Sequence, residues 1–295
     1  MGLQKPAQAR GELRTQDPRT REQAAALGAE LGDPGRDPER FLDAVFELQP
    51  VVWLRRMPGR ETFAHGERVV VKRFRGDTCS EWWHARWHGG EPRSPARREG
   101  ENLAALRALG LCVPAPIAWC EDNDAASAPW LGSRSGARSA VAMELLPHSE
   151  HLRRCLSRSS EAQVREWIAP LARVVAQLHR ANWFHRDLYL QHFAVLDAQK
   201  HRLGLLDCGR ARHARPVPMR WIVKDLAQLL HSAPAKVGTR ARLRWLVSYA
   251  RERGPDPGLE RRSLARAVIV KELRMRSHRP RHLDPRTANP DGSER

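Results

Sequence analysis

The chain has 295 residues, and its 51 Lys and Arg against 34 Asp and Glu give it a formal net charge of +17. No run approaches the roughly 18 apolar residues that a membrane-spanning helix needs, and the first residues lack the apolar core of a signal peptide. The five cysteines form no CxxC pair and no zinc spacing, which favours a reduced cytoplasmic protein over a disulfide framework.

Both ends of the chain are poor in large apolar residues. Residues 1–40 are rich in Arg, Asp, Gly, Pro and Ala, and residues 281–295 have a similar composition. Segments of this kind bury too little apolar surface to offset the entropy lost on ordering. We therefore expect both tails to be disordered, with two lobes between them.

The first lobe, residues 41–146, mixes strand and helix signals. Residues 67–74 are short and β-branched and predict a strand. Ser94 followed by Pro95 is typical of a helix start, and the helix should run over residues 95–109 and stop at the following glycine. Residues 140–146 predict another apolar strand.

The second lobe, residues 147–280, is predicted to be mainly helical. Ser160 and Gln163 form a capping box at the start of a long amphipathic helix. Residues 221–230 and 261–275 predict further helices. The predicted fold is therefore α+β and bilobal, with a small β-rich lobe that holds one helix and a larger helical lobe.

Two short stretches carry the chemistry. Residues 185–193 read H-R-D-L-Y-L-Q-H-F and match the kinase pattern H-R-D-L-x-x-x-N except that His192 replaces Asn. Residues 205–209 read L-L-D-C-G and match D-F-G with Cys208 in the middle. The two patterns in this order predict the catalytic and metal loops of a protein-kinase-like site.

Phosphoryl transfer also needs a cation on the phosphates of ATP and a carboxylate that aims it. Lys72 ends a Val-Val-Val-Lys run and is the candidate cation, and the alternative is a solvated lysine at a strand end. Glu99 is the candidate partner because Leu103 and Leu106 follow it on one helix face. Glu101 is the competing choice.

The two aspartates of the motifs have separate predicted roles. Asp187 should orient or deprotonate the acceptor hydroxyl, and Asp207 should hold Mg²⁺. Mg²⁺ prefers oxygen ligands, so the imidazole of His192 is a poor second ligand. We expect one firm metal site at Asp207, and His192 either completes a weak second position or binds a phosphate oxygen or Asp187.

The segment after the metal loop is basic and has no Ser, Thr or Tyr before Trp221. It therefore has no phosphorylation switch of its own. Its arginines are suited to bind an acceptor that is already anionic, or they form a solvated basic loop. These candidate acceptor-binding residues are Arg210, Arg212, Arg215 and Arg220.

Membrane contact is a further expectation from composition. Residues 201–295 contain 22 basic residues and only 9 acidic ones. This excess of positive charge attracts anionic partners. Trp82, Trp83 and Trp87 either fill space between the lobes or form an interfacial belt. A cytoplasmic protein with peripheral contact to the inner membrane fits this pattern, and nucleic-acid binding rests on net charge alone and is not expected.

The run from His185 to Phe193 resembles the lipopolysaccharide kinase family, whose members are bacterial enzymes that phosphorylate inner-core heptose or 3-deoxy-D-manno-octulosonic acid. The resemblance extends over residues 50–235. It implies a protein-kinase-like fold, ATP and Mg²⁺ as cofactors, and a sugar hydroxyl of an anionic glycolipid as acceptor. It also implies structural roles for His185 and for Asp225, which would brace the catalytic loop.

The same resemblance places the adenine beside the backbone of Glu144 and Leu145. Two rival functions stay open. A Ser/Thr protein kinase or an aminoglycoside- or choline-type phosphotransferase is opposed by His192. A pseudokinase scaffold that binds nucleotide without turnover is favoured by the lack of a glycine-rich loop, because residues 60–66 offer the only candidate turn over the phosphates.

Overall fold

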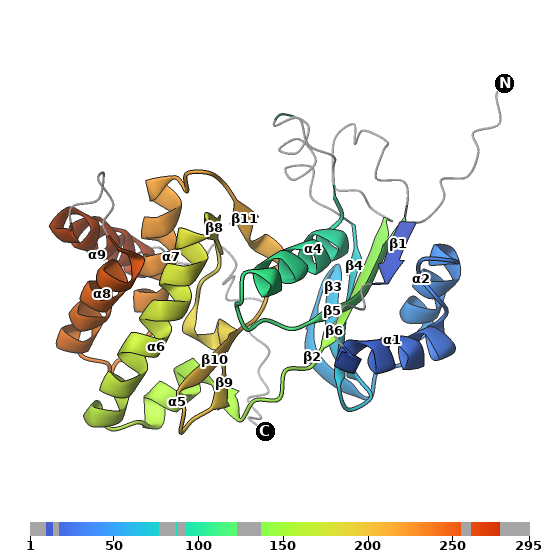
Figure 1. The fold of residues 1–295 in the computed structure, drawn as a ribbon, viewed down its shortest axis with the longest axis horizontal. Coiled ribbons are helices and arrows are strands. Elements are labelled where there is room, and N and C mark those ends of the chain that lie inside the picture. The colour runs from blue at the N-terminus through green and yellow to red at the C-terminus, as the bar shows by residue number, and fades with distance from the viewer. Residues whose placement is uncertain are drawn as a thin grey trace, which may run out of the picture. The chain divides into compact units, whose positions relative to one another are not determined.

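The computed structural model describes residues 10–13, 18–76, 87, 93–122, 137–254 and 261–277 (Figure 1). The chain divides into two units, one of residues 1–152 and 192–213 and one of residues 153–191 and 214–295. The sequence predicted a boundary at residues 146/147. The structure groups the hairpin that carries the metal loop, within residues 192–213, with the first unit. Each unit is described by itself.

A six-stranded sheet forms the centre of unit 1, with strand order β1-β5-β6-β4-β3-β2 and antiparallel neighbours throughout. Its strands are β1 (Arg10–Leu13), β2 (Val52–Met57), β3 (Arg60–His65), β4 (Val69–Arg75), β5 (Pro116–Glu121) and β6 (Arg138–Glu144). The β-branched run of the sequence becomes β4, which lies between β3 and β6 and is buried over all but its last residue.

A second, smaller sheet of unit 1 carries the metal loop. It has the order β10-β9-β7 and consists of β7 (Glu150–His151), β9 (Phe193–Asp197) and β10 (Arg202–Leu205). The short 3₁₀ helix η3 (Cys208–Arg210) and the strand β11 (Arg212–His213) follow β10. Asp207 therefore lies directly between a strand and a helical turn.

Helix α4 (Pro95–Ala108) packs against β5 and β6 of the large sheet. It begins where the sequence predicted, because Ser94 accepts a hydrogen bond from the N–H of Arg97 and Pro95 occupies the first turn. The buried side of α4 carries Glu99 together with Leu103 and Leu106.

Helices α1 (Pro18–Leu31) and α2 (Pro38–Glu47) cover the other face of the same sheet (Figure 1). The prediction of a disordered tail over residues 1–40 is wrong for this part of the chain. Ala24, Leu27 and Leu31 form a narrow apolar stripe at helical spacing and are buried with Phe41 against the sheet. The stripe is short, which is why the composition of the whole segment concealed it. Residues 281–295, the other predicted tail, lie outside the described residues.

Unit 2 is mainly helical. Its elements are α5 (Leu152–Arg158), which starts at the unit boundary, then α6 (Glu161–Arg180), β8 (Trp183–Phe184), η2 (Leu190–His192), which ends at the boundary, α7 (Met219–Ser232), α8 (Thr239–Arg253) and α9 (Arg261–Ser277). The predicted capping box of Ser160 and Gln163 is present at the start of α6. Helix α8 was not predicted. No helix among the described residues is long and apolar enough to cross a membrane.

Candidate active site

Lys72 lies in the middle of β4, opposite Thr62 of β3 and Val141 of β6, and is buried. Its Nζ donates to Oε1 of Glu99 at 2.5 Å and to Oδ1 of Asp207 at 3.1 Å. Burial alone would lower the pKa of Lys72, but the charges of Glu99 and Asp207 outweigh it and raise the pKa. A charged ammonium is therefore held beside the metal-loop aspartate.

The structure decides between the two candidate partners of Lys72. Glu99 is buried and reaches the ammonium, whereas Glu101 accepts hydrogen bonds from Arg93 at 2.5 Å and from Arg97 at 2.9 Å. The two glutamates differ because residues two apart on a helix lie on different faces. Glu99 occupies the face of α4 that turns toward the sheet.

Asp207 adopts a left-handed backbone conformation with φ of 54°, which is uncommon for a residue with a side chain. Its Oδ1 accepts from Nη2 of Arg60 at 2.7 Å as well as from Lys72. Burial would raise the pKa of Asp207, but Lys72 and then Arg60 outweigh it, His192 adds to their effect, and the pKa falls well below its usual range. The carboxylate is held ionised, as a magnesium ligand must be.

Arg60 is a site residue that the sequence analysis missed. It follows the tight turn between β2 and β3, where Gly59 has a φ of +73° and a Cβ would lie 2.9 Å from the carbonyl oxygen of Arg75. The predicted phosphate turn at residues 60–66 is wrong, because residues 60–65 form β3 itself. The turn at Gly59 was the available signal, and Arg60 lies directly after it.

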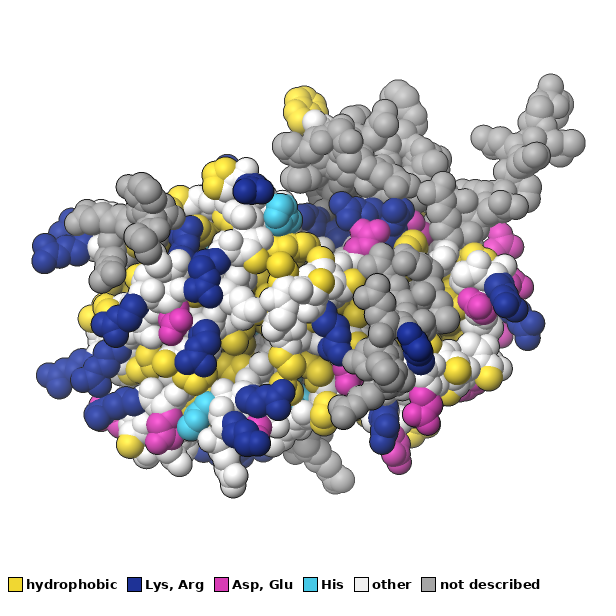
Figure 2. Space-filling model, viewed as in Figure 1, with side chains coloured by type: hydrophobic (Ala, Val, Ile, Leu, Met, Phe, Trp, Pro, Cys, Tyr) yellow, Lys and Arg dark blue, Asp and Glu magenta, His cyan; other side chains and the backbone are white. Residues whose placement is uncertain are grey.

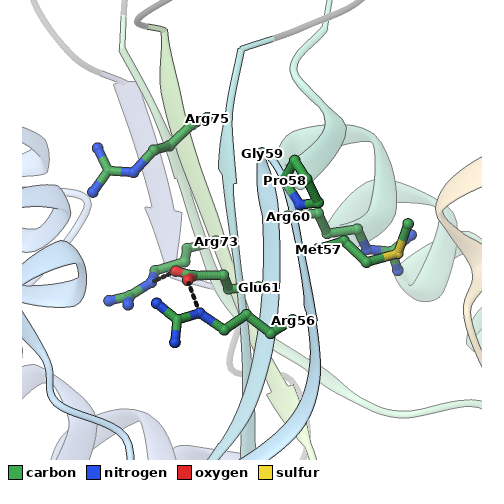
Figure 3. A pocket seen from close by; sticks show the side chains of 8 residues that line it. All are labelled: Arg56, Met57, Pro58, Gly59, Arg60, Glu61, Arg73 and Arg75. Carbon is green, nitrogen blue, oxygen red and sulfur yellow. Dashed lines mark hydrogen bonds and ion pairs between the residues drawn. The ribbon is translucent and has the colours of Figure 1, made fainter. Parts of the chain in front are cut away.

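The arginines around this turn point in two directions, as Figure 3 shows. Arg56, Arg73 and Arg75 line a pocket of about 410 Å³, in which Glu61 accepts hydrogen bonds from Arg56 at 3.2 Å and Arg73 at 2.6 Å. Arg60 extends the other way, toward the side of α4. Arg60 thus contributes its charge to Asp207, while Arg56 and Arg73 pair with Glu61.

Helix α4 also positions the metal loop through its polar side chains. Asn102 is buried and donates to the carbonyl oxygens of Cys208 at 2.9 Å and Ala211 at 3.0 Å. Arg98 donates to the carbonyl oxygen of Gly209 at 2.9 Å. A Cβ on Gly209 would lie 3.1 Å from Oε2 of Glu99, so the glycine of the D-x-G pattern lets the loop approach that carboxylate.

The catalytic loop of unit 2 is held by a second aspartate. Asp225 of α7 is fully buried and accepts from the backbone N–H of His185 at 2.6 Å and of Arg186 at 2.8 Å. His179 contacts it at 3.4 Å through Nε2. Arg186 has a positive φ of 70°, a strained conformation that these bonds maintain. The bracing contact that the resemblance implied for Asp225 is present, and it fixes His185 and the residue before Asp187.

Gln228, one turn beyond Asp225 on α7, was not predicted. It accepts from the N–H of Leu188 at 3.0 Å and donates to the carbonyl oxygen of Arg186 at 3.0 Å. The two bonds hold the backbone on both sides of Asp187, whose side chain is half-buried. The backbone around Asp187 is therefore fixed from α7 by two side chains, those of Asp225 and Gln228.

The segment after β6 uses its N–H groups inside the protein. The N–H of Glu144 donates to the carbonyl oxygen of Ala115 at 2.8 Å, and that of Leu145 donates to Arg68 at 2.7 Å. Those two donors cannot also bind adenine. If Glu144 and Leu145 contact the base, as predicted, they do so through other groups such as their carbonyl oxygens.

The four predicted acceptor-binding arginines lie on both units. Arg210 and Arg212 follow the metal loop in unit 1, whereas Arg215 and Arg220 belong to unit 2. Arg210, Arg215 and Arg220 are exposed. Of the three tryptophans, Trp82 and Trp83 lie outside the described residues, and Trp87 is 84% exposed.

Comparison with known proteins assigns the family. The model of the lipopolysaccharide kinase (Kdo/WaaP) family matches residues 53–249. The chain belongs to this family. It is 30% identical over 227 residues to the lipopolysaccharide core heptose(I) kinase WaaP of Pseudomonas aeruginosa, an alignment that covers 74% of this chain and 82% of WaaP. The kinase class and the family predicted from the His185–Phe193 run are thus confirmed.

Solved structures agree with the lipopolysaccharide kinase assignment. The structure of WaaP in complex with acyl carrier protein matches with a TM-score of 0.60 and 25% identity, and covers 90% of this chain and 97% of that one. The streptomycin–ATP–APH(2″)-IIa ternary complex matches with a TM-score of 0.50 and 13% identity over 89% and 90% of the two chains. The second match reflects a shared fold alone, and both support the predicted protein-kinase-like α+β fold.

Proposed function

We propose that this lipopolysaccharide kinase family member transfers the γ-phosphoryl group of ATP to a sugar hydroxyl of the lipopolysaccharide core. The observation that carries the proposal is the buried Lys72–Glu99 ion pair in contact with Asp207. Catalysis of phosphoryl transfer consists mainly of positioning and charge neutralisation. The intact set of Lys72, Asp187 and Asp207 opposes a pseudokinase, which has no need of Asp187 to position an acceptor.

The residues of unit 1 fit a nucleotide with Mg²⁺. Asp207 would hold the ion, because its carboxylate stays ionised and projects from a loop that α4 fixes. Bound Mg²⁺ would neutralise charge on the phosphate oxygens. The described residues contain no cluster of three or more His, Cys, Asp or Glu side chains that could hold a metal ion. Asp207 would therefore share the ion with phosphate oxygens, with water molecules and, at a weak second position, with His192.

Arg60 has a role of its own in this proposal. It shares Oδ1 of Asp207 with Lys72, so a cation that binds this carboxylate competes with Arg60 for the same oxygen. Once displaced, the guanidinium is available to phosphate oxygens, for which its planar set of donors is well suited. Arg60, next to the turn at Gly59, would thereby bind the phosphates through the charge of its side chain. A glycine-rich loop binds them through backbone N–H groups instead.

Asp187 would position the acceptor hydroxyl and accept its proton as the O–P bond forms. The bonds from Asp225 and Gln228 to the neighbouring backbone keep the Asp187 segment in place for this role. His192 would bind a phosphate oxygen or a weakly held second ion. If the wild type and a His192→Asn variant depend on Mg²⁺ equally, a special metal role for His192 is excluded.

The acceptor would be anionic and membrane-borne. Arg210, Arg212, Arg215 and Arg220 would hold the phosphorylated part of the core, and the protein would work at the cytoplasmic face of the inner membrane as a peripheral enzyme.

The solved WaaP structure contains acyl carrier protein, and we propose that this chain binds an acyl carrier protein as well. The two purified proteins should elute together in size-exclusion chromatography if they bind. Separate elution would contradict the binding of acyl carrier protein.

The test of the function uses one enzyme preparation and three acceptors. Purified protein with labelled ATP and Mg²⁺ is incubated with lipopolysaccharide from cells that lack their own core kinase, with a generic protein substrate or with an aminoglycoside. Label should enter only the lipopolysaccharide, and an Asp187→Asn variant should transfer none. Label in the protein or aminoglycoside would support a rival kinase type. A nucleotide-induced rise in melting temperature without transfer to any acceptor would support the pseudokinase.

A further inference from the structure

Helix α8 of unit 2 exposes an unusual row of side chains. Arg240, Leu243, Arg244 and Val247 lie three or four residues apart and so share one helix face. All four are exposed, and Val247 keeps 51% of its surface accessible. The outward face of a surface helix normally carries polar side chains, so the two aliphatic residues between arginines need an explanation.

Helix α9 repeats the pattern. Arg266, Ile269, Val270 and Leu273 are exposed on its outward face, and Leu273 keeps 55% of its surface accessible. The two helices contact each other and lie side by side (Figure 1). Lys and Arg side chains gather over this end of unit 2 in Figure 2. We call the two exposed rows together the α8–α9 surface.

Acidic side chains do little to neutralise this surface. The acid of α9, Glu272, is buried and pairs with Arg276, and Glu252 of α8 is half-buried. Glu161 of α6 lies near the α8 row, where Arg165, and to a lesser extent Arg244 and Arg240, lower its pKa. Glu161 already pairs with Arg165 at 2.8 Å, so the α8–α9 surface keeps an excess of positive charge.

The arginines at the starts of these helices do not serve helix stability. Arg240 lies in the first turn of α8 and Arg262 in the first turn of α9, and neither turn contains an acidic residue. The N-terminus of a helix carries partial positive charge, so a cation there is unfavourable. An anionic partner outside the protein would offset this cost.

We propose that the α8–α9 surface is where the protein docks on an anionic lipid bilayer. The aliphatic side chains would enter the headgroup boundary while the arginines bind lipid phosphates, which is the chemistry of interfacial helices. A nucleic acid would match the charge and leave the aliphatic residues exposed. The inference rests on the proposed function, since a membrane-borne acceptor gives docking its purpose.

The test measures binding to vesicles of phosphatidylglycerol and phosphatidylethanolamine, with phosphatidylcholine vesicles as the neutral comparison. The wild type should bind the anionic vesicles alone. An Arg244→Gln/Arg266→Gln variant should bind about 30-fold more weakly, since each arginine near an anionic surface contributes about fivefold. A Val247→Ser/Leu273→Ser variant should lose about tenfold.

Matched variants of unit 1 provide the control. Arg21→Gln/Arg36→Gln removes the same charge, and Val52→Ser/Leu54→Ser removes exposed aliphatic side chains of β2. Both should bind as the wild type does. The proposal is overturned if the wild type ignores anionic vesicles, if the α8–α9 variants bind normally, or if the controls lose as much affinity.

Activity measurements separate this proposal from the proposed function. The α8–α9 variants should phosphorylate a soluble, deacylated core oligosaccharide at the wild-type rate and lose activity only on vesicle-embedded lipopolysaccharide. If the wild type binds vesicles through this surface yet phosphorylates neither substrate, the proposed function fails and the docking surface stands. Equal loss on both substrates, in variants whose free energy of unfolding matches that of the wild type, would contradict the docking role.

Discussion

Two aspartates, one in each unit, are held in contrasting ways. Asp207 of unit 1 keeps part of its side chain accessible, and its described contacts are the cations Lys72 and Arg60. Asp225 of unit 2 is fully buried and accepts two backbone N–H groups. Side-chain cations can exchange places with a metal ion, whereas backbone donors cannot move away. The first arrangement suits a ligand that binds and leaves, and the second suits a permanent brace.

The contrast therefore separates a carboxylate whose partners can be exchanged for a ligand from one that is part of the fixed structure. It predicts that substitutions of Asp225 act mainly on folding and that substitutions around Asp207 act mainly on activity.

The largest effect on stability should come from Asp225→Ala. Its removal leaves the buried N–H groups of His185 and Arg186 without their acceptor, and each unsatisfied donor costs about 1–3 kcal/mol. We expect the free energy of unfolding, measured by urea denaturation, to fall by about 3 kcal/mol or more. A change within about 0.5 kcal/mol, the range of ordinary surface substitutions, would contradict the bracing role.

Asp207→Asn should abolish most activity and leave the fold intact. The amide keeps the shape but loses the charge that would hold Mg²⁺, and loss of one such electrostatic group typically lowers kcat by about 100- to 1000-fold. Lys72 keeps Glu99 as its partner, so unfolding free energy should fall less than in Asp225→Ala. Activity within tenfold of the wild type would show that the metal is held elsewhere.

Arg60→Ala should have a smaller effect, confined to the nucleotide. We expect KM for ATP to rise about tenfold, equivalent to one lost charge-assisted hydrogen bond, and Arg60→Lys should restore part of it. Arg56→Ala is the matched control, because Arg56 lies on the same hairpin and points the other way. Equal changes in KM for the two alanine variants would contradict a special role of Arg60 in binding ATP.

The weakest effect expected is that of pH on the Lys72–Asp207 pair. The pKa of Asp207 is depressed below its reference value of 3.8, so its contribution to stability is present above that pH and is lost as pH falls through the folded pKa. The pKa of Lys72 is raised above 10.5, so its contribution persists below that pH and is lost as pH rises through the folded value.

Neither group should therefore titrate between about pH 5 and pH 9. Between about pH 8 and pH 9, above the ordinary range of imidazole titration, the difference in unfolding free energy between wild type and Asp207→Asn should be constant, and it should shrink below pH 3.8. A difference that varies within the range would show that the pair is not held as described.

The sequence predicted the parts of the site that local patterns define. The catalytic and metal loops, the start of α4 and the choice of Glu99 all follow from short motifs or helical spacing, and the structure places Lys72, Glu99 and Asp207 together. Helical spacing identified Glu99 because a buried helix face brings i, i+4 and i+7 residues to one side.

What the sequence did not reveal depends on contacts between distant segments. Arg60 reaches Asp207 only because β3 is paired beside β4, and Asn102 and Gln228 are polar residues whose partners lie far along the chain. The N–H groups of Glu144 and Leu145 are taken up by pairing that no local pattern indicates. Helices α1 and α2 were missed because a stripe of few apolar side chains is hidden in a polar segment.

Mass spectrometry of the core glycolipid shows directly whether the protein phosphorylates a core sugar. Cells that lack their own core kinase would express either the wild-type chain or Asp187→Asn, each at equal level. The wild type should add one phosphate to a core sugar, and the variant should add none. An unphosphorylated core in both strains, or phosphate added equally by both, would contradict the proposed function.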